Sequence, residues 1–133
     1  MVTDTLAGLQ AGRSVVAYTA FGPDSPMKIE GGASFGNALG QRLGELASLL
    51  VQRSGVGRCV IAGGDTSGQA SRALQIRALR MIRPMAPGSP LCRAWRGSGE
   101  PLEILLKGGQ VGGPRLFGEV KSGRTDTHHT SMI

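Results

Sequence analysis

The chain has 133 residues, of which 40% are hydrophobic and 4% aromatic, so we expect one globular domain with an aliphatic core. Its net charge of +6 comes from dispersed basic residues with no dense run and no interleaved aromatics, which argues against nucleic-acid binding and favours a solvated basic surface. No stretch has the length of a membrane span or the apolar core of a signal peptide, so we expect a cytoplasmic protein without a membrane partner.

The two cysteines, Cys59 and Cys92, belong to no CxxC or His–Cys pattern. We therefore expect reduced, structural thiols and no metal site.

The chain begins with patterns that predict a helix followed by a strand. Leu6 and Leu9 share one face of a helix within residues 1–12. Residues 13–20 are rich in β-branched side chains, which predicts a strand, and the proline-containing loop 22–26 ends it. That loop either lines a ligand site at the end of the strand or is a stiff connection.

A long amphipathic helix is predicted next, starting near residue 34 and ending before the glycine-rich segment 54–57. Its apolar stripe consists of Phe35, Leu39, Leu43, Leu46, Leu49 and Leu50. Gly36, Gly40 and Gly44 recur every four residues along it, although each costs about 1 kcal/mol of helix propensity against alanine. This spacing predicts a groove for the sheet, a neighbouring helix or another subunit, or else a poor helix tolerated because of its packing.

The centre of the chain reads as a buried strand, a glycine turn and a helix start. Residues 59–62 are apolar, and apolar residues at helical spacing resume at Ala70. Gly63 and Gly64 allow a sharp turn to which a phosphate could come close. Asp65, Thr66 or Ser67 could cap the helix that follows. The hydroxyls of Thr66 and Ser67 could also reach a phosphate oxygen. This segment predicts either an anion-binding turn or a capped turn without a ligand.

The next segments predict a series of strands. Residues 76–82 indicate a short strand, and the proline-rich segment 84–90 indicates a rigid loop that either faces a ligand or acts as a spacer. Residues 91–95 and 102–107 are expected to form an antiparallel hairpin across the turn between them.

A second glycine turn, residues 107–113, follows the last of these strands and precedes a short helix at Pro114. Leu116, Phe117 and Val120 would form the buried face of that helix. Lys107 could approach a phosphate or lie on the surface at the strand end. Neither turn matches GxxxxGK[ST] or GxGxxG, so the motif signal for phosphate binding is weak.

We divide the chain into a domain at residues 1–121 and a polar tail at 122–133, which lacks periodicity and which we expect to be disordered. His128 and His129 lie in that tail, where we expect solvated side chains rather than a metal site.

Four short motifs, in this order, resemble the C-terminal nucleotide-binding domain of the four-carbon acid sugar kinases. They are YTAFGPD at 18–24, AGGDTS at 62–67, APGSP at 86–90 and LKGGQVG at 106–112. The resemblance covers about residues 15–120. Members of this family phosphorylate sugar acids such as threonate and erythronate with ATP, so it implies an ATP site that would also involve Mg²⁺.

The resemblance also implies which residues contact the nucleotide. They are Gly63, Gly64, Asp65, Thr66, Ser67, Lys107, Gly108, Gly109, Gln110 and Gly112. Asp65 stands where the family usually has glutamate, which shortens the reach of the carboxylate and puts a water or metal contact there in doubt. Gln110 retains the amide of the family's usual asparagine.

Nothing in the chain matches the sugar-acid-binding half of these kinases, and we find no general base for a sugar hydroxyl beyond the possibilities Asp24 and Asp65. We therefore expect a single three-layer α/β domain with a mixed sheet, glycine-rich strand-to-helix turns and an antiparallel hairpin. Three functions remain open: a nucleotide-binding module, an enzyme completed by a separate sugar-acid-binding subunit, or an inactive remnant that serves in association. Self-association into a homo-oligomer is expected in all three.

Overall fold

The computed structural model describes residues 2–19 and 33–123 and confirms a single α/β domain with a mixed sheet. Its elements in chain order are α1 (Val2–Gln10), α2 (Ala33–Ser54), β1 (Arg58–Ala62), α3 (Gly64–Ala73), β2 (Ile76–Ala86), β3 (Ser89–Arg96), β4 (Leu102–Lys107) and α4 (Leu116–Ser122). The sheet has the order β1-β4-β3-β2; β1 and β4 are parallel and the other two pairs are antiparallel.

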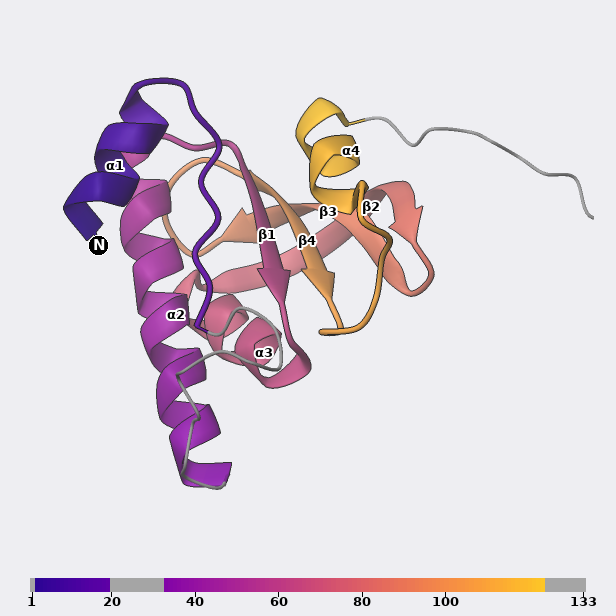
Figure 1. Ribbon diagram of the computed structural model, residues 1–133, viewed down its shortest axis with the longest axis horizontal. Coiled ribbons are helices and arrows are strands. Elements are labelled where there is room, and N and C mark those ends of the chain that lie inside the picture. Colours follow the sequence, from indigo (N-terminus) through magenta and orange to yellow (C-terminus); the bar gives the residue numbers. More distant parts are fainter. Residues whose placement is uncertain (1, 20–32, 124–133) are drawn as a thin grey trace, which may run out of the picture.

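Helices cover both faces of the sheet and give it three layers (Figure 1). On one face, α2 and α3 close a core that contains Val51, Ile61, Ala70, Leu74, Ala94, Leu102 and Ile104. On the other face, α4 closes a smaller core that contains Met85, Leu91, Leu105, Leu116 and Val120. Successive residues of β4, Ile104 and Leu105, are both fully buried because they point to opposite covered faces.

The glycine spacing in α2 forms a groove whose partner is helix α3. A Cβ added at Gly44 would stand 3.0 Å from the Cα of Ala70 and 3.1 Å from the carbonyl oxygen of Gln69. A Cβ at Gly40 would stand 3.2 Å from the Cγ of Gln69. The neighbouring-helix interpretation is therefore correct, because at Gly44 only a residue without a side chain lets the two backbones approach this closely.

The strand predicted at 13–20 is wrong for the described part of that segment. Residues 13–19 form no strand, although they run as an extended chain next to β1 (Figure 1). A strand requires a hydrogen-bonded neighbour, and β1 pairs only with β4 within the described residues. The loop predicted at 22–26 lies outside the described residues.

The rigid loop predicted at 84–90 is also wrong, because most of it belongs to a second β-hairpin. β2 continues to Ala86, where it pairs with Ser89, so that only Pro87 and Gly88 turn the chain. Gly88 has a φ of 69°, which glycine adopts readily. Pro84 is tolerated because β2 is an edge strand. The hairpin predicted from the two following segments is confirmed as β3 and β4.

At the end of the described chain, α4 includes Ser122, the first residue of the predicted tail. Residues 124–133, including both histidines, lie outside the described residues. The guanidinium of Arg58 in β1 donates to the carbonyl oxygens of Val120 and Lys121 at 2.8 and 2.9 Å, and so ties the C-terminal turn of α4 to the sheet. Glu103 in β4 accepts from the same guanidinium at 2.6 Å.

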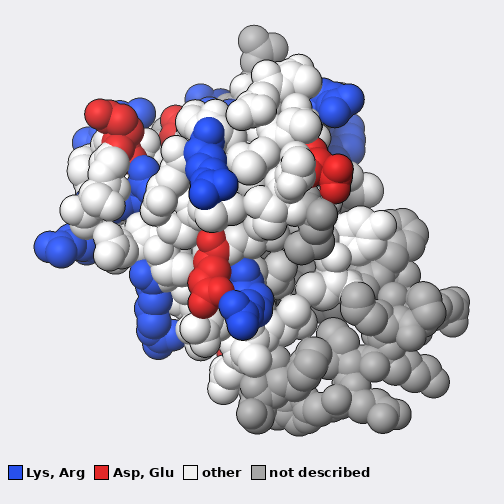
Figure 2. All heavy atoms as spheres, turned by 90° about the vertical axis from the view of Figure 1, so that its left-hand side faces the viewer, with Lys and Arg blue, Asp and Glu red and all other residues white. Residues whose placement is uncertain are grey.

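Basic residues are scattered over the face in Figure 2, where single blue side chains alternate with uncharged surface and a few acids. Across the described ranges, no helix is both long enough and apolar enough to span a bilayer.

Candidate nucleotide-binding site

The fold brings the two glycine-rich turns side by side. β1 and β4 are adjacent and parallel, so their carboxyl ends lie at the same edge of the sheet. The amide of Gly63 donates to the carbonyl oxygen of Lys107 at 2.9 Å and joins the two turns directly. The helices that follow them, α3 and α4, lie on opposite faces of the sheet. In open α/β sheets, this arrangement opens a crevice in which ligands bind.

Backbone geometry shapes the first turn. Gly63 is the N-cap of α3 with φ 109° and ψ 131°, a conformation that side-chain-bearing residues rarely adopt. Asp65, Thr66 and Ser67 do not cap the helix as predicted, because the helix already begins at Gly64 and no side chain bonds to its cap. The first amides of α3 therefore lack an intrahelical acceptor and are available to an anion.

A side chain inside this turn also lacks a partner. Of the buried side-chain oxygen and nitrogen atoms in the described residues, the Oγ of Ser67 is the one without a hydrogen bond. A buried hydroxyl without a partner normally costs about 1–3 kcal/mol. A ligand oxygen or a water molecule could satisfy it.

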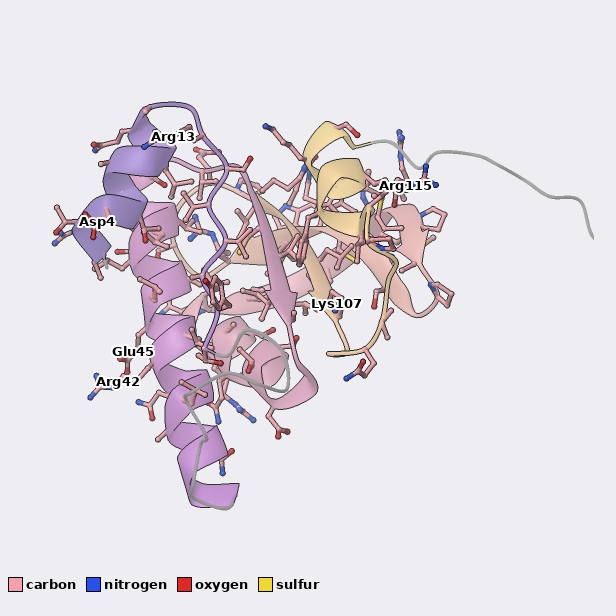
Figure 3. The ribbon with its side chains drawn as sticks, in the orientation of Figure 1. Asp4, Arg13, Arg42, Glu45, Lys107 and Arg115 are labelled. Carbon is pink, nitrogen blue, oxygen red and sulfur yellow. The ribbon has the colours of Figure 1, made fainter. Side chains whose placement is uncertain are left out.

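Lys107 closes β4 and is buried, with 8% of its surface exposed, so the interpretation of a surface lysine is wrong. Figure 3 shows it at the end of the strand, where the second turn starts. Its Nζ donates to the carbonyl oxygens of Gly108 at 2.7 Å and Gly109 at 3.0 Å. The ammonium thus fixes the start of the turn and adds positive charge at the edge where the two turns meet.

The rest of the second turn is compact and open to solvent. The amide of Val111 donates to the carbonyl oxygen of Gly108 at 3.2 Å, and the side chain of Gln110 is exposed. Gly112 has a φ of 97° and packs against Leu116, so a larger residue would be strained there. Gly64 in the first turn and Gly109 in the second both have open space where a Cβ would stand. A ligand could therefore approach both backbones.

The β2–β3 turn lies at the same end of the sheet. Because Leu91 pairs with Leu105, continuing the antiparallel register places Ser89 at the level of Lys107. Ser89 is buried with 2% of its surface exposed. Sequence reasoning treated this segment as a loop and did not single out Ser89, although its position between two prolines was a signal of an ordered turn.

Metal ligands are sparse around these turns. No cluster of three or more His, Cys, Asp or Glu side chains occurs in the part of the chain that the structure describes. Asp65 contributes one exposed carboxylate in the first turn of α3, which suits a Mg²⁺ that is held mainly by phosphate oxygens and water.

An open α/β sheet with two glycine turns at the ends of adjacent parallel strands defines a class of phosphate- and nucleotide-binding domains. Comparison with known families agrees with this class. The chain belongs to the family described as "Nucleotide-binding C-terminal domain", which matches residues 1–117. This match is consistent with the four sequence motifs, which predicted a resemblance to the C-terminal domain of the four-carbon acid sugar kinases.

Curated relatives are longer kinases. The chain is 39% identical to the 3-oxo-isoapionate kinase of Paraburkholderia graminis over 138 residues, which cover 93% of this chain and 29% of that protein. It is 37% identical to the 3-oxo-tetronate kinase of Cupriavidus necator over 111 residues, 81% of this chain and 25% of that protein. The chain thus spans less than a third of the length of these relatives.

A solved structure shares the fold. A domain of unknown function from Bordetella bronchiseptica, crystallised with citrate as a domain-swapped dimer, superposes with a TM-score of 0.63 at 24% identity. The match covers 87% of this chain and 28% of that one.

Proposed function

We propose that this chain binds ATP where its two glycine turns meet and acts as the nucleotide-binding part of a sugar-acid kinase. The observation that carries the proposal is the 2.9 Å hydrogen bond from the amide of Gly63 to the carbonyl oxygen of Lys107, which aligns both turns at one sheet edge. The names of the relatives support a phosphorylated sugar acid as the product of the whole enzyme.

Each turn would hold a different part of the nucleotide. The first amides of α3, with the hydroxyls of Thr66 and Ser67, would donate to phosphate oxygens. Residues 108–112 would pack against the nucleotide, and the ammonium of Lys107 would keep them in place. Bound ATP with Mg²⁺ supplies the phosphoryl group and screens its charge.

We propose that the chain does not catalyse phosphoryl transfer by itself. Asp65 is exposed in the first turn of α3, whereas a general base for a sugar hydroxyl is usually tuned by burial and by neighbouring groups. Asp24 lies outside the described residues. The sugar-acid site and the base would then lie outside residues 1–133.

Isothermal titration of the purified chain with ATP and ADP, with Mg²⁺ present, tests the nucleotide site. The informative variant is Gly64→Val, because a Cβ at Gly64 meets no protein atom within 4 Å and the backbone there is not strained. The added side chain would instead fill the space that a phosphate needs. Gly68→Ala is the matched control in the same helix, where a Cβ would meet only the Nη1 of Arg72 at 4.0 Å.

Micromolar to low millimolar binding that survives Gly68→Ala and is lost in Gly64→Val would support the proposal. Absence of heat, together with a melting temperature that ATP does not change, would refute it and favour an inactive remnant.

The Bordetella domain is a domain-swapped dimer. By analogy with that dimer, we propose that this chain also forms a homo-oligomer. Light scattering of the protein as it elutes from a gel-filtration column would test this.

A further inference from the structure

Lys107 carries a buried positive charge that no described carboxylate compensates. Only 8% of its surface is exposed. Within residues 2–19 and 33–123, no ion pair links its ammonium to an Asp or Glu side chain. Buried lysines are nearly always paired, because moving a charge out of water is costly. Lys107 therefore requires an anion that the described residues do not supply.

The ammonium of Lys107 also has one N–H group to spare. Its Nζ carries three, and two of them donate to the carbonyl oxygens of Gly108 and Gly109. Both acceptors are neutral backbone groups, so they orient the ammonium without compensating its charge. The third N–H has no acceptor in the described part of the chain and is available to a ligand.

The side chain beside Lys107 in the neighbouring strand is Ser89. Leu91 of β3 pairs with Leu105 of β4, and both leucines belong to the core under α4. Side chains alternate along a strand, and Ser89 and Lys107 each lie two residues from one of these leucines, at the same end of the sheet. They are therefore cross-strand neighbours on the face that α4 covers.

The hydroxyl of Ser89 is a second donor without a partner. It forms no hydrogen bond with any other residue that the structure describes, although only 2% of the surface of Ser89 is exposed. Unlike the Oγ of Ser67, its Oγ still reaches solvent, so that small exposed area includes the hydroxyl. A buried hydroxyl that is unpartnered and open on one side can donate to a ligand atom.

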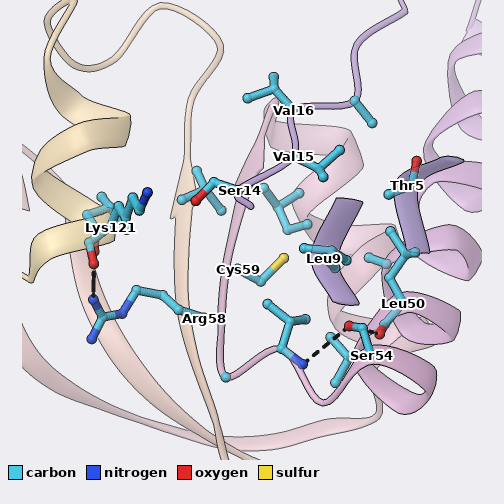
Figure 4. A pocket seen from close by; sticks show the side chains of 18 of the residues that line it. Thr5, Leu9, Ser14, Val15, Val16, Leu50, Ser54, Arg58, Cys59 and Lys121 are labelled. Carbon is cyan, nitrogen blue, oxygen red and sulfur yellow. Dashed lines mark hydrogen bonds between the residues drawn. The ribbon is translucent and has the colours of Figure 1, made fainter. Parts of the chain in front are cut away.

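An anion finds no comparable place in the apolar groove beside β1, which has a volume of about 800 Å³ (Figure 4). Neither Lys107 nor Ser89 lines this groove. The guanidinium of Arg58 at its margin already donates to the carbonyl oxygen of Lys121 at 2.9 Å and pairs with the carboxylate of Glu103. The free donors of the sheet edge are thus at the second glycine turn.

We propose that Lys107 and Ser89 form an anion subsite beneath the second glycine turn, where both donate to one phosphate oxygen of the bound nucleotide. This inference rests on the proposed function and adds a third segment, the β2–β3 turn, to the site. A phosphate oxygen fits because it is charged and can accept both hydrogen bonds at once. It would compensate the ammonium and satisfy the hydroxyl in one contact.

Calorimetric titration of the full chain with ATP, with Mg²⁺ present, tests the role of Ser89. We expect Ser89→Ala to bind ATP at least tenfold more weakly, because it loses a hydrogen bond to a charged oxygen. Ser98→Ala is the matched control, since Ser98 is exposed in the turn between β3 and β4 at the opposite end of the sheet. Its affinity for ATP should equal that of the parent.

The melting temperature without ATP separates a ligand contact from a structural one. Removing a hydroxyl that has no partner should leave the melting temperature of Ser89→Ala unchanged or raise it. A lower melting temperature would show that the hydroxyl stabilises the free chain, and would overturn the proposal.

A double-mutant cycle tests whether Lys107 and Ser89 hold the same oxygen. If they do, the loss of ATP affinity in the variant that combines Lys107→Met with Ser89→Ala should be smaller than the product of the two single losses. Losses that multiply fully would overturn the shared oxygen. Parent-like ATP binding by Ser89→Ala would overturn the subsite and leave the proposed function standing, whereas a parent chain that binds no ATP would refute both.

Discussion

Replacing Gly44 by alanine tests whether α2 and α3 touch through their backbones. An alanine in a helix gains about 1 kcal/mol of propensity over glycine. At Gly44, however, the new Cβ would meet the Cα and N of Ala70 at 3.0 and 3.1 Å, and Ala70 is fully buried. These are backbone atoms that cannot rotate away, so the helices must separate, at a cost of about 1–3 kcal/mol. We expect Gly44→Ala to lower the free energy of unfolding by about 1 kcal/mol.

Gly40→Ala is the matched control, one helical turn earlier. Its Cβ would meet the Cγ of Gln69 at 3.2 Å, an atom of a flexible side chain that can move. The propensity gain then dominates, and this variant should be more stable than the parent by up to about 1 kcal/mol. The two variants should therefore differ by about 2 kcal/mol, or roughly 8 °C in melting temperature for a domain of this size. Thermal and urea unfolding followed by circular dichroism would measure this. Equal stability of the two variants would refute the close packing.

Three other predictions concern single side chains. Lys107→Met removes the ammonium from the carbonyl oxygens of Gly108 and Gly109, and calorimetry should show ATP binding at least tenfold weaker, with a fold that circular dichroism finds unchanged. Burial raises the pKa of the Cys59 thiol from 9.0 to about 11, so the unfolded thiol ionises first. Between these pH values the free energy of unfolding should fall by roughly 2 kcal/mol, and Cys59→Ala should remove that part of the decrease. Arg58→Met breaks the link from β1 to the end of α4 and should cost about 1–3 kcal/mol in urea unfolding; no change would contradict this role.

Local sequence determined the elements whose signals are strong at short range. The apolar run before Gly63 predicted β1, the leucine spacing predicted α2, and the order of glycine turns indicated the family. In these cases, turn chemistry and hydrophobic period alone restrict the backbone to one conformation. The glycine spacing of α2 likewise predicted close packing, although it left the partner open.

Tertiary structure decided the features that depend on contacts between residues distant in the sequence. Residues 13–19 have strand-like composition but form no strand, because no described strand pairs with them. Pro84 indicated a loop, yet it lies in β2 because an edge strand tolerates a missing amide. Lys107 could have been exposed, but it is buried at the end of β4, where that strand pairs with β1.

The contact between the two glycine turns likewise depends partly on local sequence and partly on tertiary structure. Each glycine turn is readable in the sequence, because a residue without a Cβ is required where φ is positive, as at Gly63 and Gly112. Their contact is not readable, since Gly63 and Lys107 lie far apart in the sequence and the hydrogen bond between them forms only when β4 pairs with β1. Pairing between distant strands is set by the whole core, so the sequence determined the two glycine turns and the sheet determined that they lie side by side.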